Sequence, residues 1–541
     1  MRYIMNKMLN AWFKSKNVSL SKPLIILSLL QLLMSLTAIF FAFFSRETID
    51  AALMSTSSQS FITYAIVIGS LLLIQLLIST LAPYIKTAYT IRIENKLKSN
   101  MFNQLLSTKL KETQNYHTGD LLNHLSSDLH IISDSITDII PRFIFYVIRF
   151  LGAFVLLFFI DTLLSIILIS LGVLLFLGSR LLAKPIKERH KKMQETETNV
   201  RSLIQESLSH IPVIKSFEAE KKMTHQLDTK QDAYYQAALR KQRLSMVTSF
   251  GMTGFLAVGY GLAIILGAIR LSSGALTIGG LTALIQLVGH LQSPFGGLSH
   301  LVPRYYQMSA SIERMMVLDH LEKDDEAKVF FNRFELLSAK HVSFAYQDEL
   351  ILKDMSFAIK QGDIVQIAGE SGKGKTTLIK LLLGLYEPTE GLLEVTLDHQ
   401  IYPLSASLRS LFTYVPQGHM MMSGTIKDNL ELYQKASDEA LWHVLTIAEL
   451  ASDFKKLPLG LDTPLGEKGA GLSEGQIQRL ALARALLKDA PIILLDEITS
   501  ALDINTEQKI LSNIQALSTK TMIIISHRKL PESFIHQTIT L

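Results

Sequence analysis

Long apolar stretches alternate with charged stretches over the N-terminal part of the chain, and the mean hydropathy of the whole sequence is positive. A helix needs about 20 consecutive apolar residues to cross a bilayer. The pattern predicts six membrane spans, over 24–44, 61–84, 141–160, 162–182, 247–269 and 278–302. Later apolar runs are short, such as 364–368 and 522–525, and are typical of buried strands.

The links between the spans predict their orientation, because cytoplasmic loops carry an excess of Lys and Arg. Three links are short and poor in basic residues, so we place them outside the cell: 45–60, the one at Asp161, and 270–277. The links 85–140 and 184–246 are long and basic, so we place them and both termini in the cytoplasm. Apolar residues recur in these two links at helical spacing, which predicts helical extensions of the spans.

Residues 1–22 are basic and contain no acid, and their apolar residues fall on one helical face. This favours a short helix lying in the membrane interface. A cleaved signal peptide is the alternative, but the apolar run that follows is too long for one. Pro23 then precedes the first span.

A phosphate-binding loop is predicted at 369–376, which matches G-x-x-x-x-G-K-[ST] between a strand, 364–368, and a helix, 377–383. In that context the loop's backbone N–H groups surround an anion. Lys375 would reach the terminal phosphates and the Thr376 hydroxyl would bind Mg²⁺. The residues expected at the nucleotide are Gly369, Glu370, Ser371, Gly372, Lys373, Gly374, Lys375, Thr376 and Thr377.

A second apolar run, 491–495, ends in Asp496 and Glu497, which predicts a buried strand that delivers carboxylates to a metal and an attacking water. Just upstream, 472–476 reads Leu-Ser-Glu-Gly-Gln before a helical pattern. Together with the loop at 369–376, these residues closely resemble the nucleotide-binding domain of ABC transporters. Glu474 departs from the usual LSGGQ signature, whereas Ser473 and Gly475 keep its γ-phosphate contacts.

Four further positions match the same family. Tyr346 matches the aromatic residue that stacks on adenine, Gln417 the Q-loop, the segment 500–503 the D-loop, and His527 the switch histidine. The resemblance implies ATP and Mg²⁺ as cofactors. It places Glu497, His527, Lys375 and Gln417 in catalysis, Ser473, Gly475, Gln476 and Asp503 at the nucleotide, and Thr376, Gln417 and Asp496 at the metal.

The expected architecture is multidomain, with an all-α six-helix transmembrane domain followed by an α/β P-loop ABC ATPase domain with a helical subdomain near 420–475. We divide the chain into an interfacial helix (1–22), the transmembrane domain (23–310), a linker (311–335) and the ATPase domain (336–541). The sequences 118–128 and 214–220 resemble landmarks of the type IV exporter fold. The chain has fourteen residues after His527, so we expect the family's final strands and tail helix to be largely missing.

Composition narrows the function. The absence of cysteine excludes disulfides, thiolate metal sites and the cysteine peptidase that some ABC exporters carry. The net charge of +5 is modest and gives no reason to expect nucleic acid as a partner.

One chain has one P-loop and one signature, and in the family a signature serves the ATP of the opposite subunit. We therefore expect a second half-transporter, which favours a homodimer, with a heterodimer as the alternative.

The apolar spans favour a hydrophobic or amphipathic cargo, either a peptide or a drug-like compound, exported across a bacterial cytoplasmic membrane. A lipid flippase and an ATP-gated channel or sensor remain as alternatives. Six spans with a consistent charge bias argue against a soluble ABC ATPase. An importer would keep its permease on a separate chain.

Arg149 is the sharpest candidate for a cargo site, because it lies inside the third predicted span, where a charge is costly. In one interpretation it is satisfied by neighbouring carbonyls or by a polar partner such as Gln286 or His290 in the last span. In another, the helical extensions shift the membrane boundary and leave Arg149 in a watery vestibule. In the functional interpretation, Arg149 lines the cargo cavity and favours an acidic substrate.

Overall fold

A computed structural model describes residues 12–53, 58–324, 331, 333–347, 349–370, 372–418, 421–466, 469–497, 504–516, 520–526 and 534–541. The chain divides into two compact units. The first unit comprises residues 1–102 and 119–319, and the second comprises 103–118 and 320–541. The segment 103–118, which lies within the first link predicted to be cytoplasmic, thus belongs to the same unit as the ATPase domain.

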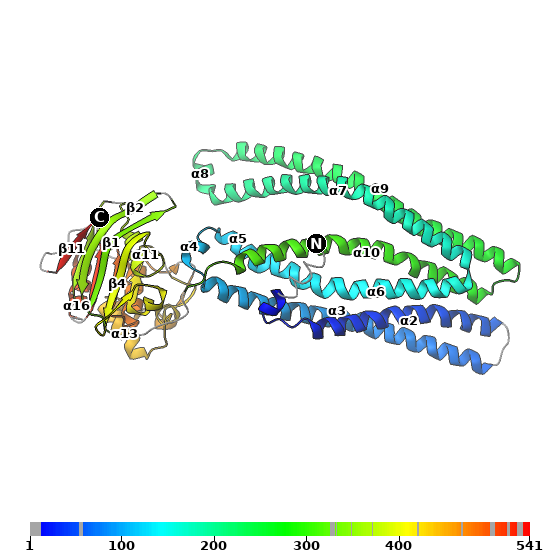
Figure 1. Ribbon diagram of the computed structural model, residues 1–541, viewed down its shortest axis with the longest axis horizontal. Coiled ribbons are helices and arrows are strands. Elements are labelled where there is room, and N and C mark those ends of the chain that lie inside the picture. Colours follow the sequence, from blue (N-terminus) through cyan, green and yellow to red (C-terminus); the bar gives the residue numbers. More distant parts are fainter. Residues whose placement is uncertain are drawn as a thin grey trace. The chain divides into compact units, whose positions relative to one another are not determined.

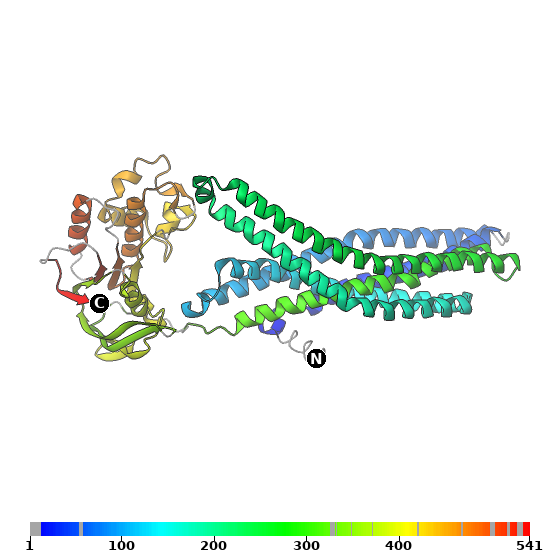
Figure 2. The ribbon, with the colours of Figure 1, turned by 90° about the horizontal axis from the view of Figure 1, so that it is seen from above.

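Six long helices build the first unit (Figure 1). They are α2 (Ser21–Leu53), α3 (Ser58–Leu106), α6 (Leu129–Ile160), α7 (Thr162–Ser209), α9 (Glu220–Ser272) and α10 (Ile278–Asp319). Helices α2, α6 and α10 pack against one another, whereas α7 packs mainly on α9. Figures 1 and 2 both show α7 and α9 running together to the short helix α8 (Ile211–Ser216).

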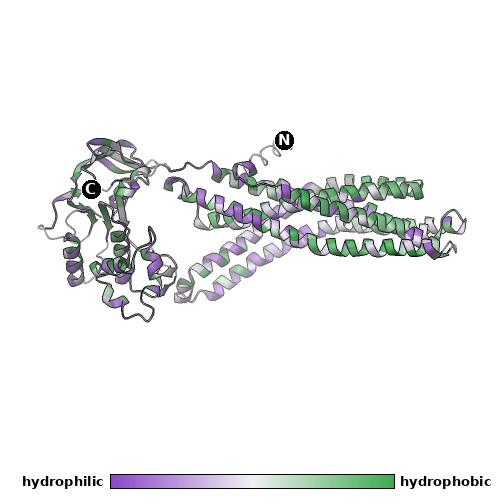
Figure 3. Ribbon diagram, turned by 90° about the horizontal axis from the view of Figure 1, so that it is seen from below, coloured by the Kyte–Doolittle hydropathy of each residue, from purple (hydrophilic) through white to green (hydrophobic). Residues whose placement is uncertain are grey.

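The structure confirms that the two long links predicted to be cytoplasmic are helical extensions of the predicted spans. Helix α3 continues to Leu106, and α4 (Leu110–Thr113), α5 (Thr118–Asn123) and a π-helical turn (His124–Asp128) then lead into α6. In the second link, α7 and α9 flank α8. Figure 3 shows hydrophobic residues concentrated in the halves of the long helices that hold the predicted spans, and hydrophilic residues in the extensions.

Four helices of the described chain are long and apolar enough to cross a membrane: Ser21–Leu53, Gln59–Leu106, Thr118–Ile160 and Glu220–Ser272. The other two predicted spans lie in α7, whose described apolar part is Thr162–Leu175, and in α10. Helix α10 is less apolar because it carries Gln286, His290 and Gln292. The spans in α7 and α10 therefore stay predictions.

The predicted interfacial helix falls mainly on residues 1–11, outside the described residues. The part that follows packs inside the first unit instead of lying open on its surface. Trp12 and Phe13 are buried, and the Trp12 indole Nε1 donates to Asp319 Oδ2 at 2.6 Å, at the end of α10. Lys16 Nζ pairs with the same carboxylate at 2.5 Å.

The second unit contains two main sheets. An antiparallel sheet has the order β2 (Glu349–Lys360), β1 (Leu336–Tyr346), β4 (Glu390–Leu397) and β5 (Gln400–Pro403). A parallel sheet has the order β11 (Gln537–Thr540), β3 (Ile364–Ala368), β10 (Thr521–Ile525), β9 (Ile492–Asp496) and β6 (Phe412–Val415). Strands β3, β9 and β10 are short, mostly apolar and buried, as strands covered on both faces require. The edge strand β11 buries only Ile539.

Helices and short strands complete the second unit. Helix α11 (Lys375–Leu382) and the 3₁₀ turn η2 (Ala406–Leu411) belong to the core that contains the two sheets. The predicted helical subdomain is present as β7 (Gly424–Thr425), α12 (Ile426–Leu430), α13 (Asp438–Ile447), α14 (Ala451–Phe454), the turn η3 (Gly460–Asp462) and β8 (Pro464–Leu465). It is followed by α15 (Glu474–Leu487), and α16 (Ile504–Gln515) lies between β9 and β10.

The end of the chain corrects one expectation. The family's final strands were expected to be largely missing, but β11 adds to the edge of the parallel sheet beside β3. The backbone N–H of Leu541 donates to Ala368 O at 3.0 Å, directly before the P-loop. A few residues are enough because one short strand satisfies the open edge of β3.

Candidate functional site

The nucleotide site is built at the carboxyl edge of the parallel sheet. Strands β3, β9 and β10 are in register, so that Ile525 pairs with both Ile367 and Asp496. The loops that leave these strands therefore meet at one edge, where open α/β sheets bind ligands. The P-loop follows β3, Asp496 is the last residue of β9, and Glu497 comes directly after it. The predicted switch histidine, His527, follows β10 in the sequence but lies outside the described residues.

The P-loop has the backbone geometry that its glycines predict. Gly374 has φ +92°, and a Cβ there would lie 2.8 Å from the side chains of Ile351 and Leu352. Helix α11 begins directly afterwards, so its free N–H groups face the loop. Lys375 is buried, and its Nζ donates to the carbonyls of Gly369 (2.8 Å) and Glu370 (3.1 Å). The predicted contact Ser371 lies outside the described residues, as does Asp503 of the D-loop.

Asp496 lies next to the P-loop in a setting that suits a divalent cation. The Thr376 hydroxyl and the Tyr414 hydroxyl both donate to Asp496 Oδ2 at 3.3 Å. Its other oxygen, Oδ1, is buried and has no hydrogen-bond partner among the described residues. Burial raises the pKa of Asp496, and the two hydroxyl hydrogen bonds oppose that shift. An unpartnered carboxylate oxygen beside a threonine hydroxyl is a donor set that Mg²⁺ prefers.

Sequence reasoning missed Tyr414, which precedes the Q-loop by three residues. Burial raises the pKa of its phenol, and the neighbouring Asp496 raises it further. The phenol therefore stays protonated and donates its hydrogen bond to Asp496. A tyrosine in a short apolar strand is also typical of ordinary core packing, so its sequence carried no signal of this contact.

Gln417 and Glu497 are in direct contact. The Gln417 amide Nε2 donates to Glu497 Oε2 at 2.6 Å. Glu497 adopts φ +55°, an uncommon conformation for a residue with a side chain, and its backbone N–H donates to Ile525 O at 3.0 Å. Strain of this kind often marks functional sites. The structure thus brings together the predicted general base and the predicted Q-loop.

The signature residues serve as the cap of a helix. Ser473 is the N-cap of α15, with its Oγ accepting from Gln476 N at 3.3 Å, and Gln476 Oε1 accepts from Ser473 N at 3.0 Å. Glu474 is exposed in the first turn, where a negative charge suits the helix dipole. Among the described residues, no hydrogen bond or ion pair joins this segment, which includes Gly475, to the P-loop of the same chain.

The predicted adenine-stacking residue, Tyr346, belongs to an aromatic cluster. Its ring contacts Phe344 and Tyr386 edge-on, with ring centres 4.9 and 5.4 Å apart. The Tyr386 hydroxyl hydrogen-bonds the side chain of Gln114, which directly follows α4. Burial raises the pKa of Tyr386 to about 12. This contact connects the adenine side of the site to the segment 103–118, and sequence reasoning did not predict it.

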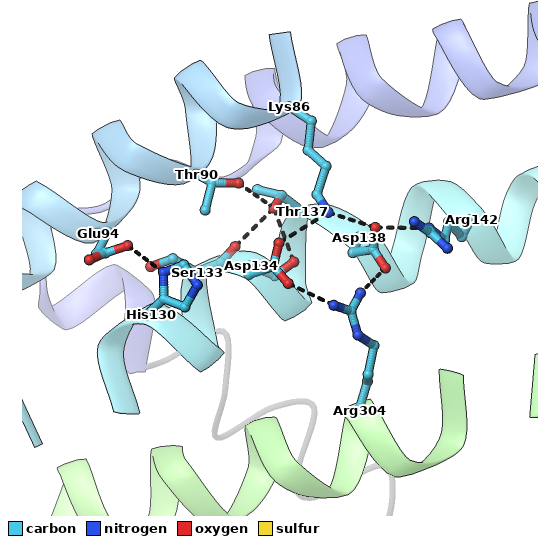
Figure 4. Close-up of polar contacts among 10 residues, drawn as sticks. All are labelled: Lys86, Thr90, Glu94, His130, Ser133, Asp134, Thr137, Asp138, Arg142 and Arg304. Atoms are coloured by element: carbon cyan, nitrogen blue, oxygen red, sulfur yellow. Dashed lines mark hydrogen bonds and ion pairs between the residues drawn. The ribbon is translucent and has the colours of Figure 1, made fainter. Parts of the chain in front are cut away.

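A cluster of charged and polar side chains in the first unit joins the extensions that are predicted to be cytoplasmic (Figure 4). Asp138, which is buried, pairs with Lys86 of α3 at 2.7 Å, with Arg142 at 2.8 Å and with Arg304 of α10. Asp134 pairs with Lys86 at 3.0 Å and with Arg304 at 2.9 Å. These ion pairs connect α3, α6 and α10 to one another.

Arg149 lies on the same helix α6, between Asp138 and the end of the helix. Its Nε and Nη2 contact His290 Nδ1 of α10 at 3.1 and 2.6 Å. The interpretation that His290 is a polar partner of Arg149 is thus confirmed. Gln286, the other partner considered, has a buried Oε1 with no partner among the described residues.

Comparisons with known proteins agree with this architecture. The family model for the ABC transporter transmembrane region matches residues 24–295, and the model for ABC transporter matches residues 352–500. A protein of Rickettsia bellii (strain RML369-C) with the name of an export ATP-binding/permease protein is 30% identical over 521 residues, covering 94% of this chain and 89% of its own length.

A multidrug resistance ABC transporter ATP-binding and permease protein of Lactococcus lactis subsp. lactis is 29% identical, covering 83% of this chain and 78% of its own length. A solved structure of a bacterial Atm1-family ABC exporter with ATP bound has the same fold, with a TM-score of 0.79 and 24% identity, and the match covers 94% of this chain and 91% of that one. This chain therefore belongs to the ABC transporters, as an exporter-type half-transporter that couples ATP hydrolysis to export across a membrane.

Proposed function

We propose that this half-transporter works as a homodimer that exports a hydrophobic or amphipathic compound, either a peptide or a drug-like molecule, across a bacterial cytoplasmic membrane. One observation carries the proposal: a single chain supplies Lys375, Asp496, Glu497 and Ser473 together with its own helical membrane domain. No second type of chain is needed to complete a nucleotide site. The multidrug name of the Lactococcus relative supports a hydrophobic cargo.

The described residues have clear roles in hydrolysis. Lys375, whose Nζ is bonded to the loop carbonyls of Gly369 and Glu370, would neutralise the terminal phosphates of ATP. Thr376 and Asp496 would hold Mg²⁺, which supplies charge neutralisation on the phosphates when bound. Glu497, oriented by the Gln417 amide, would polarise the attacking water.

The proposed dimer follows from the separation of the signature and the P-loop within one chain. The signature at Ser473 makes no hydrogen bond or ion pair to the described part of its own P-loop. Two chains meeting head to tail would bring each signature to the other chain's nucleotide and give two equivalent sites. Closure around ATP and opening after hydrolysis would then move the helical extensions and switch the access of the cavity.

The function is tested in inside-out vesicles that contain this chain as the sole ABC protein. We expect ATP-dependent accumulation of labelled hydrophobic compounds above their equilibrium level, and none in vesicles that carry Glu497→Gln. An ATP-gated channel would only speed equilibration. Activity that appears only after a second half-transporter is added would overturn the homodimer.

A further inference from the structure

Arg149 is an isolated cation deep in the membrane domain. It lies eleven residues before Ile160, the last residue of α6. At a rise of about 1.5 Å per residue this is roughly 16 Å, close to the middle of a ~30 Å hydrocarbon core. The side chain is half-buried in the first unit. A charge at that depth is expensive and must have a partner or a function.

The contacts of Arg149 give its guanidinium one acceptor atom but no counter-charge among the described residues. Its partner, His290 Nδ1, accepts the bonds and therefore carries no proton. The guanidinium carbon also lies 5.2 Å from the centre of the Phe145 ring, a weak attraction. Within the described part of the chain, no carboxylate forms an ion pair with Arg149. The cations Lys86 and Arg304 near the cytoplasmic side, by contrast, share two carboxylates.

An apolar groove of about 450 Å³, open on the outside of the unit, is lined by residues of α2 and by the turn of α6 that follows Arg149. Gly152, one helical turn after Arg149, forms part of its wall, and Ser35 of α2 hydrogen-bonds Phe145 O nearby at 2.9 Å. The wall is otherwise aliphatic and aromatic, and several of its side chains are open to the outside of the unit: Phe40 at 48%, Leu151 at 53% and Val155 at 49% exposure.

We propose that Arg149 binds the carboxylate of an amphiphilic cargo whose apolar part occupies this groove. The inference rests on the proposed export function and names its substrate class. An arginine offers paired N–H donors that match a carboxylate, and the unpartnered charge gives the groove a preference for anions. A phospholipid is the competing occupant, and the copurification experiment below distinguishes it from cargo.

The test uses the full chain in lipid nanodiscs and two probes with the same alkyl chain, decanoate and 1-decanol. The readout is the probe concentration that gives half-maximal stimulation of ATP hydrolysis. In Arg149→Gln, this concentration should rise at least about tenfold for decanoate and less than about twofold for decanol, since only the charged hydrogen bonds are lost. Arg92→Gln removes an exposed arginine from the cytoplasmic part of α3 and should change neither value.

The two probes distinguish a cargo-binding role of Arg149 from a purely structural one. Equal shifts for both probes in Arg149→Gln would show that the arginine is only structural and would overturn the inference. If that variant does not fold, Arg149→Lys keeps the charge but loses the planar donor pair, and should weaken decanoate alone; an equal effect on both probes again overturns it.

The wild-type protein separates this inference from the proposed function. Stimulation by decanol without any preference for decanoate refutes the anion site and leaves export standing. No stimulation by either probe counts against both. A phospholipid that copurifies with the wild type and is lost from Arg149→Gln, with unchanged responses to the probes, would assign Arg149 to a resident lipid and overturn the cargo site.

Discussion

Replacing Asp128 by asparagine should destabilise the packing of α6 on α10. Asp128 ends the π-helical turn before α6 and is 2% exposed. Its Oδ1 and Oδ2 accept two hydrogen bonds from Arg314 of α10, at 2.5 and 3.0 Å, one from Ser311 at 2.7 Å and one from His124 at 2.7 Å. Asp128→Asn keeps the shape of the side chain but removes its charge.

The shift in the pKa of Asp128 gives the size of the expected loss of stability. Burial alone would raise this pKa, but the hydrogen bonds from Arg314, His124 and Ser311 outweigh it and lower the pKa from 3.8 to about 2. At about 1.4 kcal/mol per pH unit, the ionised carboxylate stabilises the folded unit by about 2 kcal/mol at neutral pH. At an unfolding entropy of about 2.1 cal/mol/K per residue, that loss lowers the unfolding midpoint of a unit of this size by about 3 °C.

The tryptophans supply the assay. The chain has two, and Trp12 hydrogen-bonds Asp319, which follows Arg314 on α10 by five residues. In a Trp442→Phe background, the fluorescence of Trp12 reports the unfolding of this part of the membrane domain alone. Thermal unfolding of the detergent-solubilised protein, with and without Asp128→Asn, measures the shift.

The effect should depend on pH. Because the pKa of Asp128 is lowered by folding, its contribution is complete above about pH 5 and is lost as the pH falls through about 3.8 toward 2. The difference between wild type and Asp128→Asn should therefore be equal at pH 6 and 8 and should shrink below pH 4.

An exposed ion pair on the same unit is the control. Glu197 and Arg201 lie one turn apart on α7 at 2.6 Å, with 34% and 77% of their side chains exposed. Glu197→Gln should cost less than about 0.5 kcal/mol, because water screens the pair. A midpoint for Asp128→Asn within a degree of wild type, or no larger than the Glu197→Gln shift, would refute the argument from burial.

Three other predictions concern the nucleotide site. Glu497→Gln should abolish ATP turnover while ATP binding, measured by filter retention of labelled nucleotide, stays within about twofold, because only the water-polarising carboxylate is lost; near-normal turnover would remove Glu497 as the base. Coexpressed Lys375→Ala and Ser473→Arg chains, each inactive alone, should recover ATPase activity, since a head-to-tail dimer contains one intact site; a mixture as inactive as its parents would argue against shared sites. Tyr414→Phe removes a hydrogen bond to Asp496, which contributes about 1 kcal/mol. The Mg²⁺ concentration for half-maximal activity should therefore rise by roughly twofold to tenfold. An unchanged Mg²⁺ requirement would show that this hydrogen bond does not contribute to Mg²⁺ binding.

The sequence alone determined those features whose physical cause is local along the chain. A P-loop needs its glycines, lysine and threonine in consecutive positions, and a membrane span needs one continuous apolar run. The strand at 364–368, the P-loop and the helical extensions were predictable for this reason. The order of the motifs then identified the family, which the comparisons confirm.

Only the tertiary structure decided which distant residues meet. Asp128 and Arg314 are 186 residues apart, and their contact depends on the rotation of two helices about their axes. The choice of His290 over Gln286 as the partner of Arg149 has the same cause, because both residues lie one turn apart on α10. Tyr414 reaches Asp496 through the parallel pairing of β6 with β9. Hydropathy indicates which stretches are apolar, but the register of strands and the rotation of helices decide which residues are buried and what they contact.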